Sequence, residues 1–360
     1  MTQKVTVEKQ ELYAALQKLM KVIPSTTNLM ALNYVHLSMD NDELVLRGTD
    51  LDVSLVVRVK AQGNIDDTCV LAKALYVLAK PESKKDRTSV VIECSGKERV
   101  GINVDSMTTV IQSFPVEDYP ELPKVRLKFA VKSWNGGELK KLLSYVIPAM
   151  SDDETRSHIN CAAFLDKKIV TTDGHRLHTA VLPSAVKEDV LLPARAVYLC
   201  DRFLNKKQSV SIKINKDKNR VLVESENWEL YSKFSQGEFP PHDQVVPKGN
   251  EVHVEIETKV LSKVLKKLNG LASFLKLSLD GGQCKLLTED TEFGSTETEL
   301  SVKQLNGSAN PLLVGFTISY LMDVINFDFE KAVLKLGGPL DAALVEAGAV
   351  RQSVVMPMRI

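Results

Sequence analysis

The feature that most constrains the fold of this 360-residue chain is a pattern that occurs three times. A tyrosine recurs in the same local context at Tyr76, Tyr198 and Tyr320, at equal intervals of 122 residues (76 to 198, and 198 to 320). Each copy is long enough to bury a core of its own, so the repeat predicts three related domains. Segments that contain Phe-Pro end the first two copies, and the expected domains are therefore 1–123, 124–247 and 248–360.

The order of elements is the same in every copy. A short strand leads into an amphipathic helix, with apolar residues at helical spacing, in residues 5–23, 129–147 and 252–270. Alternating hairpin strands follow, then a second helix that carries the recurrent tyrosine, and then a closing hairpin. Because short turns join the strands, the sheets are expected to be antiparallel. The sequence therefore predicts an α+β fold in which each domain has two helices packed on antiparallel sheets.

Cysteine usage and hydropathy place the chain in a broad class. The five cysteines form no C-x-x-C pair, so we expect buried reduced thiols and neither a disulfide framework nor a zinc site. The first residues are polar, unlike a signal peptide, and no apolar run reaches the ~18 residues needed to span a bilayer. We therefore expect a cytoplasmic protein with no membrane contact.

Charge is balanced overall but distributed unevenly. The chain has 46 basic and 46 acidic residues. Even so, five of the six expected helices carry a net positive charge, and the sixth, at 317–328, is negative; the five lie at 8–22, 72–80, 138–147, 193–207 and 257–270. In the helix expected at 257–270, Lys259, Lys263 and Lys266 lie opposite the apolar face. One such stripe is typical of a solvated helix face, whereas the same sign on five helices favours a shared polyanion partner. No zinc finger, recognition helix or aromatic RNA-binding signature is present, so base reading is not expected.

The densest group of polar residues is T-T-D-G-H-R-L-H-T-A at 171–180. Its Asp and His could serve a nucleophilic triad, but the chain has no G-x-S-x-G elbow to supply the serine. On a helix, the three-residue spacing of His175 and His178 could hold a metal ion. This stretch, however, is typical of a turn and a strand, so the spacing does not indicate a metal site. No H-E-x-x-H motif and no G-x-x-x-x-G-K-[ST] loop occurs, so no catalytic residue, metal or cofactor is expected.

The repeat offers a structural interpretation of the same stretch. Asp173 lies where Asp50 lies in the first copy, so it is expected to be a turn residue that accepts backbone N–H groups. Residues 174–177 depart from the first copy and suggest a local role, with Gly174 permitting positive φ and Leu177 offering an apolar contact. The final segment, S-V-V-M-P-M-R-I, is either core or an adaptable peptide-binding surface.

Together these motifs resemble those of the bacterial replication sliding clamps, the β subunits of DNA polymerase III. The resemblance covers the whole chain and rests on the three repeats and on T-T-D-G-H-R-L at 171–177, I-S-Y-L-M-D-V-I at 318–325 and V-V-M-P-M-R-I at 354–360. It implies a head-to-tail homodimer whose six domains form a ring around duplex DNA, with the helices lining the hole. The family is not enzymatic: it binds DNA without regard to sequence and tethers the polymerase, and an ATP-driven clamp loader opens the ring.

The resemblance also implies a peptide-binding pocket between the second and third domains, where partners dock through a short linear motif. Those partners are the DNA polymerase III catalytic subunit, the clamp loader, and other repair and replication proteins. Apolar residues of the pocket would take the motif's Leu and aromatic side chains, and Arg176 and Arg359 could bond its polar groups. Carried over by motif, the pocket consists of Arg156, Ile159, Thr172, Gly174, His175, Arg176, Leu177, Pro240, Val245, Tyr320, Leu340, Val354, Met356, Pro357, Met358 and Arg359.

Two further sets of residues complete the expected surfaces. The dimer interface is expected near Val104, Leu268 and Leu271. The chain departs from the family pattern at Gln244, where Arg is frequent, and at 337–343, where a Ser-rich loop is usual. The basic residues expected to face DNA are Lys73, Lys80, Lys141, Arg195, Arg202, Lys263 and Lys267.

Two alternatives to a clamp remain open at this point. The first is a repeat-built interaction scaffold that has the same fold and pocket but never encircles DNA. The second is a hydrolase centred on Asp173 and His175. A solution mass separates the first from a dimer, and a His175→Gln variant separates the second from a protein with no turnover to lose.

Overall fold

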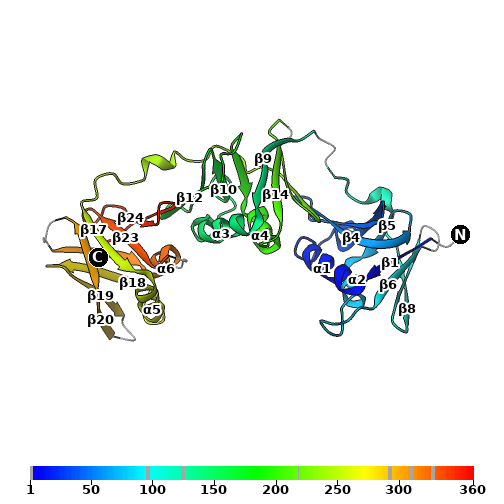
Figure 1. Cartoon of the computed structure of the whole chain (residues 1–360), viewed down its shortest axis with the longest axis horizontal. Helices are drawn as coiled ribbons and strands as arrows, with labels where there is room; N and C mark the ends of the chain where they lie inside the picture. Colours follow the sequence, from blue (N-terminus) through cyan, green and yellow to red (C-terminus); the bar gives the residue numbers. More distant parts are fainter. Residues whose placement is uncertain are drawn as a thin grey trace. The chain divides into compact units, whose positions relative to one another are not determined.

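The computed structural model describes residues 3–94, 98–122, 126–217, 219–290, 294–307, 311–325 and 329–360 (Figure 1). The chain forms two compact units. One consists of Met1–Gly137 and Tyr198–Phe234, and the other of Glu138–Val197 and Ser235–Ile360. The middle repeat therefore contributes to both units. The domain boundary expected at residues 123 and 124 lies outside the described residues.

Helices occur where the amphipathic patterns predict them. The end of the helix expected at 317–328, residues 326–328, lies outside the described residues. In each repeat the first helix follows directly on a strand, and the second carries the recurrent tyrosine. The described part of the chain contains six α-helices, which are α1 (Lys9–Leu19), α2 (Ala72–Leu78), α3 (Gly136–Val146), α4 (Ala194–Phe203), α5 (Thr258–Leu268) and α6 (Ile318–Ile325).

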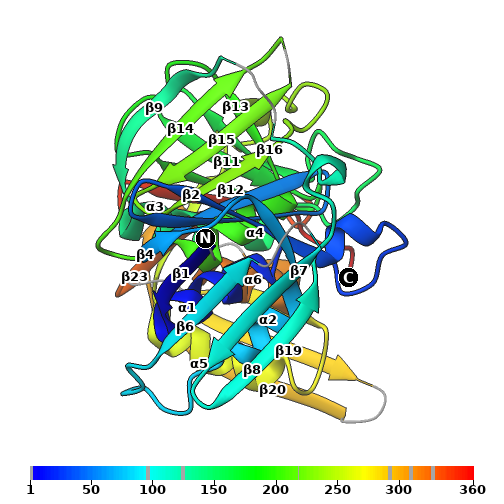
Figure 2. The same cartoon turned by 90° about the vertical axis from the view of Figure 1, so that its right-hand side faces the viewer.

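The first unit is built around one antiparallel sheet of twelve strands. The main path runs β8-β7-β6-β1-β4-β16-β15-β14-β9, and a branch runs from β4 through β3 and β2 to β5. Figure 2 shows α1 and α2 side by side next to these strands. The strands are β1 (Gln3–Glu8), β2 (Tyr34–Asp40), β3 (Glu43–Thr49), β4 (Val53–Asn64), β5 (Thr68–Leu71), β6 (Ser89–Cys94), β7 (Arg99–Val104), β8 (Met107–Gln112), β9 (Lys128–Asn135), β14 (Ser209–Asn215), β15 (Arg220–Ser225) and β16 (Trp228–Ser232).

The second unit contains two sheets. One has nine strands in the order β13-β10-β11-β12-β25-β24-β23-β17-β21, and the other has four in the order β20-β19-β18-β22. The nine strands are β10 (Cys161–Leu165), β11 (Lys168–Thr172), β12 (Arg176–Val181), β13 (Val190–Pro193), β17 (Val252–Glu257), β21 (Val302–Asn306), β23 (Lys331–Leu336), β24 (Ala343–Ala347) and β25 (Arg351–Val355). The four are β18 (Phe274–Asp280), β19 (Gln283–Asp290), β20 (Gly294–Leu300) and β22 (Leu312–Thr317).

Every strand pair in the described residues is antiparallel, as the hairpin signals predict. Strands from neighbouring repeats also pair with each other. β4 of the first repeat pairs with β16 of the second, and β12 of the second repeat pairs with β25 of the third. Each of these two junctions makes one continuous sheet out of two repeats.

Helix α5 shows why the lysine stripe forms a helix face. Leu261, Leu265 and Leu268 are buried in the core of the third repeat, whereas Lys259 and Lys263 are exposed. Burial of this leucine stripe stabilises the helix, and the charged side chains keep the opposite face in water. The amphipathic interpretation of this segment is confirmed.

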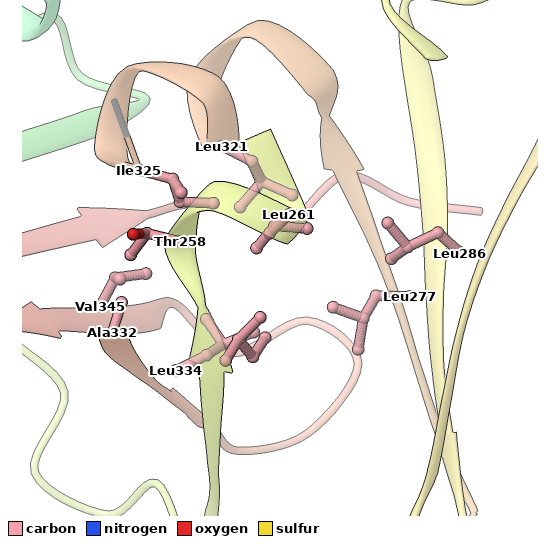
Figure 3. A pocket seen from close by; sticks show the side chains of 10 residues that line it. Thr258, Leu261, Leu277, Leu286, Leu321, Ile325, Ala332, Leu334 and Val345 are labelled. Atoms are coloured by element: carbon pink, nitrogen blue, oxygen red, sulfur yellow. The ribbon is translucent and has the colours of Figure 1, made fainter. Parts of the chain in front are cut away.

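The core of the third repeat encloses a small cavity between α5, α6 and the sheets (Figure 3). It measures about 20 Å³ and is lined by apolar side chains such as Leu261, Leu321 and Leu334. The hydroxyl of Thr258, also at the wall, donates to the Phe329 carbonyl oxygen. A space of this size holds one water at most, and the Thr258 hydroxyl at its wall is already engaged with the Phe329 carbonyl oxygen. We regard it as a packing gap and not as a ligand site.

The structure corrects two expectations about the surface. Val104 and Leu268 are buried in the cores of their own repeats, so they are not available for a dimer interface; Leu271 is half-buried. The expected helix at 193–207 ends at Phe203, so Lys206 and Lys207 do not add to helix charge. The positive helix charge is instead concentrated on α5, which carries four lysines.

Candidate functional site

The T-T-D-G-H-R stretch forms a tight turn between β11 and β12. One Asp173 carboxylate oxygen accepts the backbone N–H groups of His175 at 2.8 Å and Arg176 at 2.9 Å. The Thr172 hydroxyl donates to the Arg176 carbonyl oxygen at 2.7 Å and accepts the Gly174 N–H. Gly174 adopts φ +92°, a conformation that glycine takes without strain. The predicted turn role of Asp173 is confirmed.

The same turn occurs in the first repeat. The Asp50 carboxylate accepts the N–H groups of Asp52 and Val53, and the Thr49 hydroxyl donates to the Val53 carbonyl oxygen. Leu51 occupies the place of Gly174 and adopts φ +79°. Residues 174–177 therefore depart from the first copy in sequence, while the turn keeps the same backbone hydrogen bonds. What differs between the two copies is the set of side chains that the turn presents.

Arg176 is held in place by contacts on one side of the turn. Its guanidinium forms ion pairs with Asp173, at 3.0 Å, and with Asp323 of α6. It also covers the ring of Tyr320, with the guanidinium carbon 4.3 Å from the ring centroid, and the His175 ring stacks near the same tyrosine. The Arg176 side chain is only 13% exposed. Its charge is already compensated, so its main effect is to fix this turn against α6.

The strand junction β12–β25 brings the middle repeat and the end of the chain together. Leu177 lies opposite Val354, and the ladder continues where the Met356 N–H donates to the His175 carbonyl oxygen at 2.9 Å. Two residues on, the Met358 N–H donates to the Gly315 carbonyl oxygen of β22 at 2.9 Å. A Cβ on Gly315 would lie 2.9 Å from the Met358 carbonyl oxygen, so only glycine lets this segment approach.

An apolar group of residues lies at this junction, and we call it the site cluster. Four buried residues form its centre, and four partly buried residues pack against them. Alternation along β12 places Leu177 on the face away from Arg176 and α6. The linker after β16 contributes Phe239 and Val246 to the cluster. The eight members are Val170, Leu177, Leu344, Val354, Leu165, Phe239, Val246 and Ala342.

Only Leu177 and Val354 of this cluster belong to the set chosen from the sequence. In the linker the sequence predicts Pro240 and Val245, whereas the neighbouring residues Phe239 and Val246 pack against the site cluster. Val245 itself is 53% exposed. The alternation of apolar residues along β11 and β24 is the signal that identifies Val170 and Leu344. The linker has no regular alternation, so its sequence does not indicate which of its residues face the cluster.

The remaining pocket residues surround this centre to different degrees. Met356 is 44% exposed and Leu340 is 60% exposed, while Pro357 and Met358 are half-buried. Arg156 pairs with Asp153 and lies beside Gly174. Ile159 is buried in the core, and Leu340 projects from a turn that the Asp341 carboxylate closes by accepting the Gly338 N–H. Arg359 is exposed.

The seven basic residues expected to face DNA are all exposed. Lys73, Lys141, Arg195, Arg202, Lys263 and Lys267 lie on helices, and Lys80 follows the end of α2. Cations on helix surfaces attract a polyanion without reading its sequence. Their exposure makes them available for such a contact.

The thiols and histidines offer no poised nucleophile or base. All five cysteines are free, and burial raises the pKa of Cys69, Cys161 and Cys200 to about 12. His178 is fully buried, and burial lowers its pKa to about 4. In the part of the chain that the structure describes, no group of three or more His, Cys, Asp or Glu residues is placed to hold a metal ion. Among the same residues, no helix combines the length and apolar character needed to cross a bilayer.

Three family models match the chain in sequence order. They describe the N-terminal, central and C-terminal domains of the DNA polymerase III beta subunit, and they match residues 3–123, 134–241 and 243–359. Similar proteins named beta sliding clamp occur in Pseudomonas putida strain KT2440, at 25% identity over 373 residues, and in Chlamydia pneumoniae, at 26% over 376 residues. Each of these matches covers 99% of both chains.

Solved structures of the same kind share the fold. The DNA polymerase III subunit beta of Pseudomonas aeruginosa superposes with a TM-score of 0.90 at 24% identity. The DNA polymerase sliding clamp of Caulobacter crescentus gives a TM-score of 0.88, also at 24% identity. Both matches cover 99% of this chain and 100% of the other.

The three repeats, the continuous sheets and these matches define a sliding clamp, a processivity factor of DNA replication that is not itself catalytic. The chain belongs to the DNA polymerase III beta subunit family. The hydrolase alternative is therefore set aside, and Asp173 and His175 are residues of a turn.

Proposed function

We propose that two copies of this chain form a closed ring around duplex DNA and that replication partners dock on the site cluster. The observation that carries the docking proposal is the β12–β25 junction, where buried apolar residues continue into exposed Met356 and Val245. A core of buried apolar side chains with adaptable residues at its margin suits the Leu and aromatic anchors of a short peptide. The docking surface we propose includes all sixteen pocket residues chosen from the sequence, together with Val170, Leu344, Phe239 and Val246.

The domain limits that we propose are 1–123, 124–247 and 248–360. The three family matches, which end at residues 123, 241 and 359, support this division. The exposed basic residues on the helices would contact the DNA backbone, with α5 making the strongest contribution because it carries four lysines. Such contacts are weak and independent of sequence, so they permit sliding.

For the dimer contact we replace Val104 and Leu268 with two unpaired sheet edges. Within the described residues, β8 pairs only with β7, and β20 pairs only with β19. The edge strand β8 also exposes Met107 and Val110. An exposed edge with unused N–H and C=O groups is a template for pairing with another chain. Head-to-tail pairing of β8 with β20 of a second copy would cover both edges.

The partners that we infer are double-stranded DNA, the DNA polymerase III catalytic subunit, the clamp loader, and other replication and repair proteins with a clamp-binding peptide. The beta sliding clamp relatives support this set through their family. We place the protein in the cytoplasm, where reducing conditions keep free cysteines such as these five in the thiol form.

The ring is tested by its retention on DNA of different topology. After loading, the protein is expected to stay on nicked circular DNA through gel filtration and to leave when a restriction enzyme linearises the circle. Equal retention on both forms would favour the scaffold alternative, as would a solution mass that shows only monomer at micromolar concentration.

A further inference from the structure

A buried polar group on the helix side of the β12–β25 junction has no part in the docking proposal. His178 is 0% exposed, and its ring stacks on that of Tyr145 from α3, with centroids 5.1 Å apart. His178 Nδ1 donates to the Tyr145 backbone carbonyl oxygen at 2.8 Å. The Tyr145 hydroxyl lies 2.6 Å from the Ser353 hydroxyl of β25. Ser353 is also the residue directly opposite His178 in the strand ladder.

These contacts fix the tautomer of the neutral imidazole. A carbonyl oxygen only accepts, so Nδ1 carries a hydrogen, and in the neutral ring Nε2 then holds a lone pair. Nε2 is buried and has no hydrogen-bond partner among the residues that the structure describes. A proton added at Nε2 would become a buried donor without an acceptor, and the ring would become a buried cation.

The charged groups around the ring do not compensate that cation. On β25, Arg351 covers the Tyr145 ring with its guanidinium carbon 5.0 Å from the centroid. Burial opposes protonation of His178 most strongly, and the hydrogen bond to the Tyr145 carbonyl oxygen favours it less strongly. On the ring's own strand and turn, Arg176 opposes protonation and Asp173 favours it, both more weakly still. The other neighbours that face His178 across the strand ladders and from α3 are neutral, namely Thr171 of β11, Ser353 of β25 and Tyr145.

The position of His178 connects this group to the docking surface. His178 and Ser353 point to the helix side, and the adjacent pair, Leu177 and Val354, forms the centre of the site cluster on the opposite side. The buried histidine and the centre of the site cluster therefore lie on two neighbouring residue pairs of the same strand ladder. A change that separates the His178–Ser353 rung also separates the Leu177–Val354 rung.

The first repeat provides a comparison inside the same chain. At the β4–β16 junction, Leu55 takes the place of His178 and Leu230 takes the place of Ser353, and the two leucines lie opposite each other and are buried. The sheet junction therefore does not require a histidine. Of the two junctions, only the one that carries the site cluster has a histidine at this rung.

We propose that His178 is a proton-sensitive positioning residue: the neutral ring holds β12 and β25 in register beneath the docking surface, and its protonation opens this junction. Only the expected effect on peptide binding rests on the proposed docking function. The opening of the junction is a property of unit Glu138–Val197 and Ser235–Ile360 itself.

The test is amide hydrogen exchange of the full chain, followed by mass spectrometry between pH 7.5 and pH 4.5 with correction for intrinsic rates. In the native chain, exchange of peptides from β12 and β25 is expected to rise by roughly 50-fold, because the open junction binds the proton that the closed one excludes. In His178→Leu, which copies the first repeat, the rise is expected to disappear. Peptides from β4 and β16 serve as the internal control and are expected to change equally in both proteins.

An equal acid response of β12 and β25 in the native chain and in His178→Leu overturns the proposal. Should His178→Leu fail to fold, His178→Gln replaces it, since glutamine can still donate to the Tyr145 carbonyl oxygen without titrating. The variants His175→Gln and His242→Gln control for the two nearby histidines and are expected to retain the acid response.

Binding of a fluorescent synthetic peptide that contains Leu and Phe separates this inference from the docking proposal. If the peptide binds the native chain at pH 7.5 and is lost at acid pH only when His178 is present, both proposals hold. If it binds neither protein at pH 7.5, the docking proposal fails, while the exchange data still decide on His178.

Discussion

The two strand junctions between repeats have the same backbone and different side chains. β4 pairs with β16 at the first junction, and β12 pairs with β25 at the second. On the helix side, Leu55 faces Leu230 in the first, whereas His178 faces Ser353 in the second. One ladder therefore tolerates an apolar pair and a titratable pair at the same rung.

The opposite sides of the two ladders differ in the reverse sense. Ser54 faces Tyr231 at the first junction, and the Tyr231 hydroxyl donates to the Glu229 carboxylate at 2.6 Å. Leu177 faces Val354 at the second, within the site cluster. The first junction thus presents a polar side where the second presents an apolar one.

The margins of the junctions continue this difference. Beside the first, Asp52 and Lys233 form an exposed ion pair at 2.8 Å. Their counterparts beside the second are His175 and Met356, which share a backbone hydrogen bond and leave the methionine side chain exposed. The backbone ladder is therefore sufficient to join two repeats, and the proposed docking surface additionally depends on the apolar side chains of the second junction.

Exchanging the side chains of the junctions is the strongest test of this view. The double variant Leu177→Ser with Val354→Tyr copies the first junction and is expected to weaken a Leu/Phe peptide by about 3 kcal/mol or more, because the apolar centre is lost. Isothermal calorimetry measures the affinity. The reverse exchange, Ser54→Leu with Tyr231→Val, is the matched control and should create no new peptide site. Retained affinity in the first variant would contradict the docking proposal.

The buried histidine is expected to make the two junctions differ in their response to acid. His178 has its pKa lowered to about 4 by burial, so the neutral form stabilises the native state. That stability is fully present above the unfolded pKa near 6.5 and is lost as the pH falls toward 4. Between pH 7.5 and 4.5 the free energy of unfolding of the native chain should fall by about 2–3 kcal/mol more than that of His178→Leu. Scanning calorimetry at both pH values measures the difference, and an identical fall in the two proteins would refute it.

Ion pairs at the two junctions are expected to contribute unequally to the free energy of unfolding. Asp323→Ala removes one of two carboxylates from Arg176, whose side chain is 13% exposed, and should cost about 1–2 kcal/mol of unfolding free energy. Asp52→Ala removes a partner from exposed Lys233 and should cost less than about 0.5 kcal/mol. Urea denaturation of both variants checks the ranking, and the reverse order would show that Arg176 is not a fixed part of the turn.

The exposed methionine is expected to contribute to binding without contributing to folding. Met356→Ala should weaken the Leu/Phe peptide by about 1 kcal/mol, since a partly exposed apolar side chain covers the bound anchor. Its thermal midpoint should stay within one degree or so of the native value, because the side chain is not in the core. Lys233→Ala at the other junction is the matched control and should leave peptide affinity unchanged. An unaltered affinity in Met356→Ala would remove this residue from the docking surface.

The smallest expected difference in stability is between the two turns that contain Gly174 and Leu51. Gly174→Ala forces a side chain onto φ +92°, although the nearest atom, in Arg156, is 3.8 Å from the new Cβ. The cost should therefore be about 1 kcal/mol and arise from the backbone alone. Leu51→Gly relieves φ +79° but gains flexibility when unfolded, so its effect should stay within about 0.5 kcal/mol. Thermal denaturation distinguishes the two, and a large loss in Leu51→Gly would mean that the Leu51 side chain has a role of its own.

Helices and strand pairing could be predicted because they follow from patterns that repeat. The leucine stripe of 258–268 and the alternation of 34–40 and 43–49 specify their elements locally, and the equal tyrosine spacing extends each assignment to two further copies. The role of Asp173 followed in the same way from Asp50. Each of these predictions depends on residues close together in sequence.

The rest depends on contacts between distant residues. That Arg176 pairs with Asp323 could not be inferred from spacing, because α6 approaches the turn only in the folded unit. The burial of Val104 and Leu268 and the choice of Phe239 over Pro240 have the same origin. An irregular linker has no period from which the inward-facing residue can be read.

The pairing of β12 with β25 has a consequence for synthesis of the chain. Strand β12 (residues 176–181) can pair with β25 only after residues 351–355 have been synthesised. The β4–β16 ladder needs the chain only as far as residue 232. Until β25 has been made, the β12 edge keeps its backbone N–H and C=O groups unpaired, and an open edge of this kind can pair with other chains.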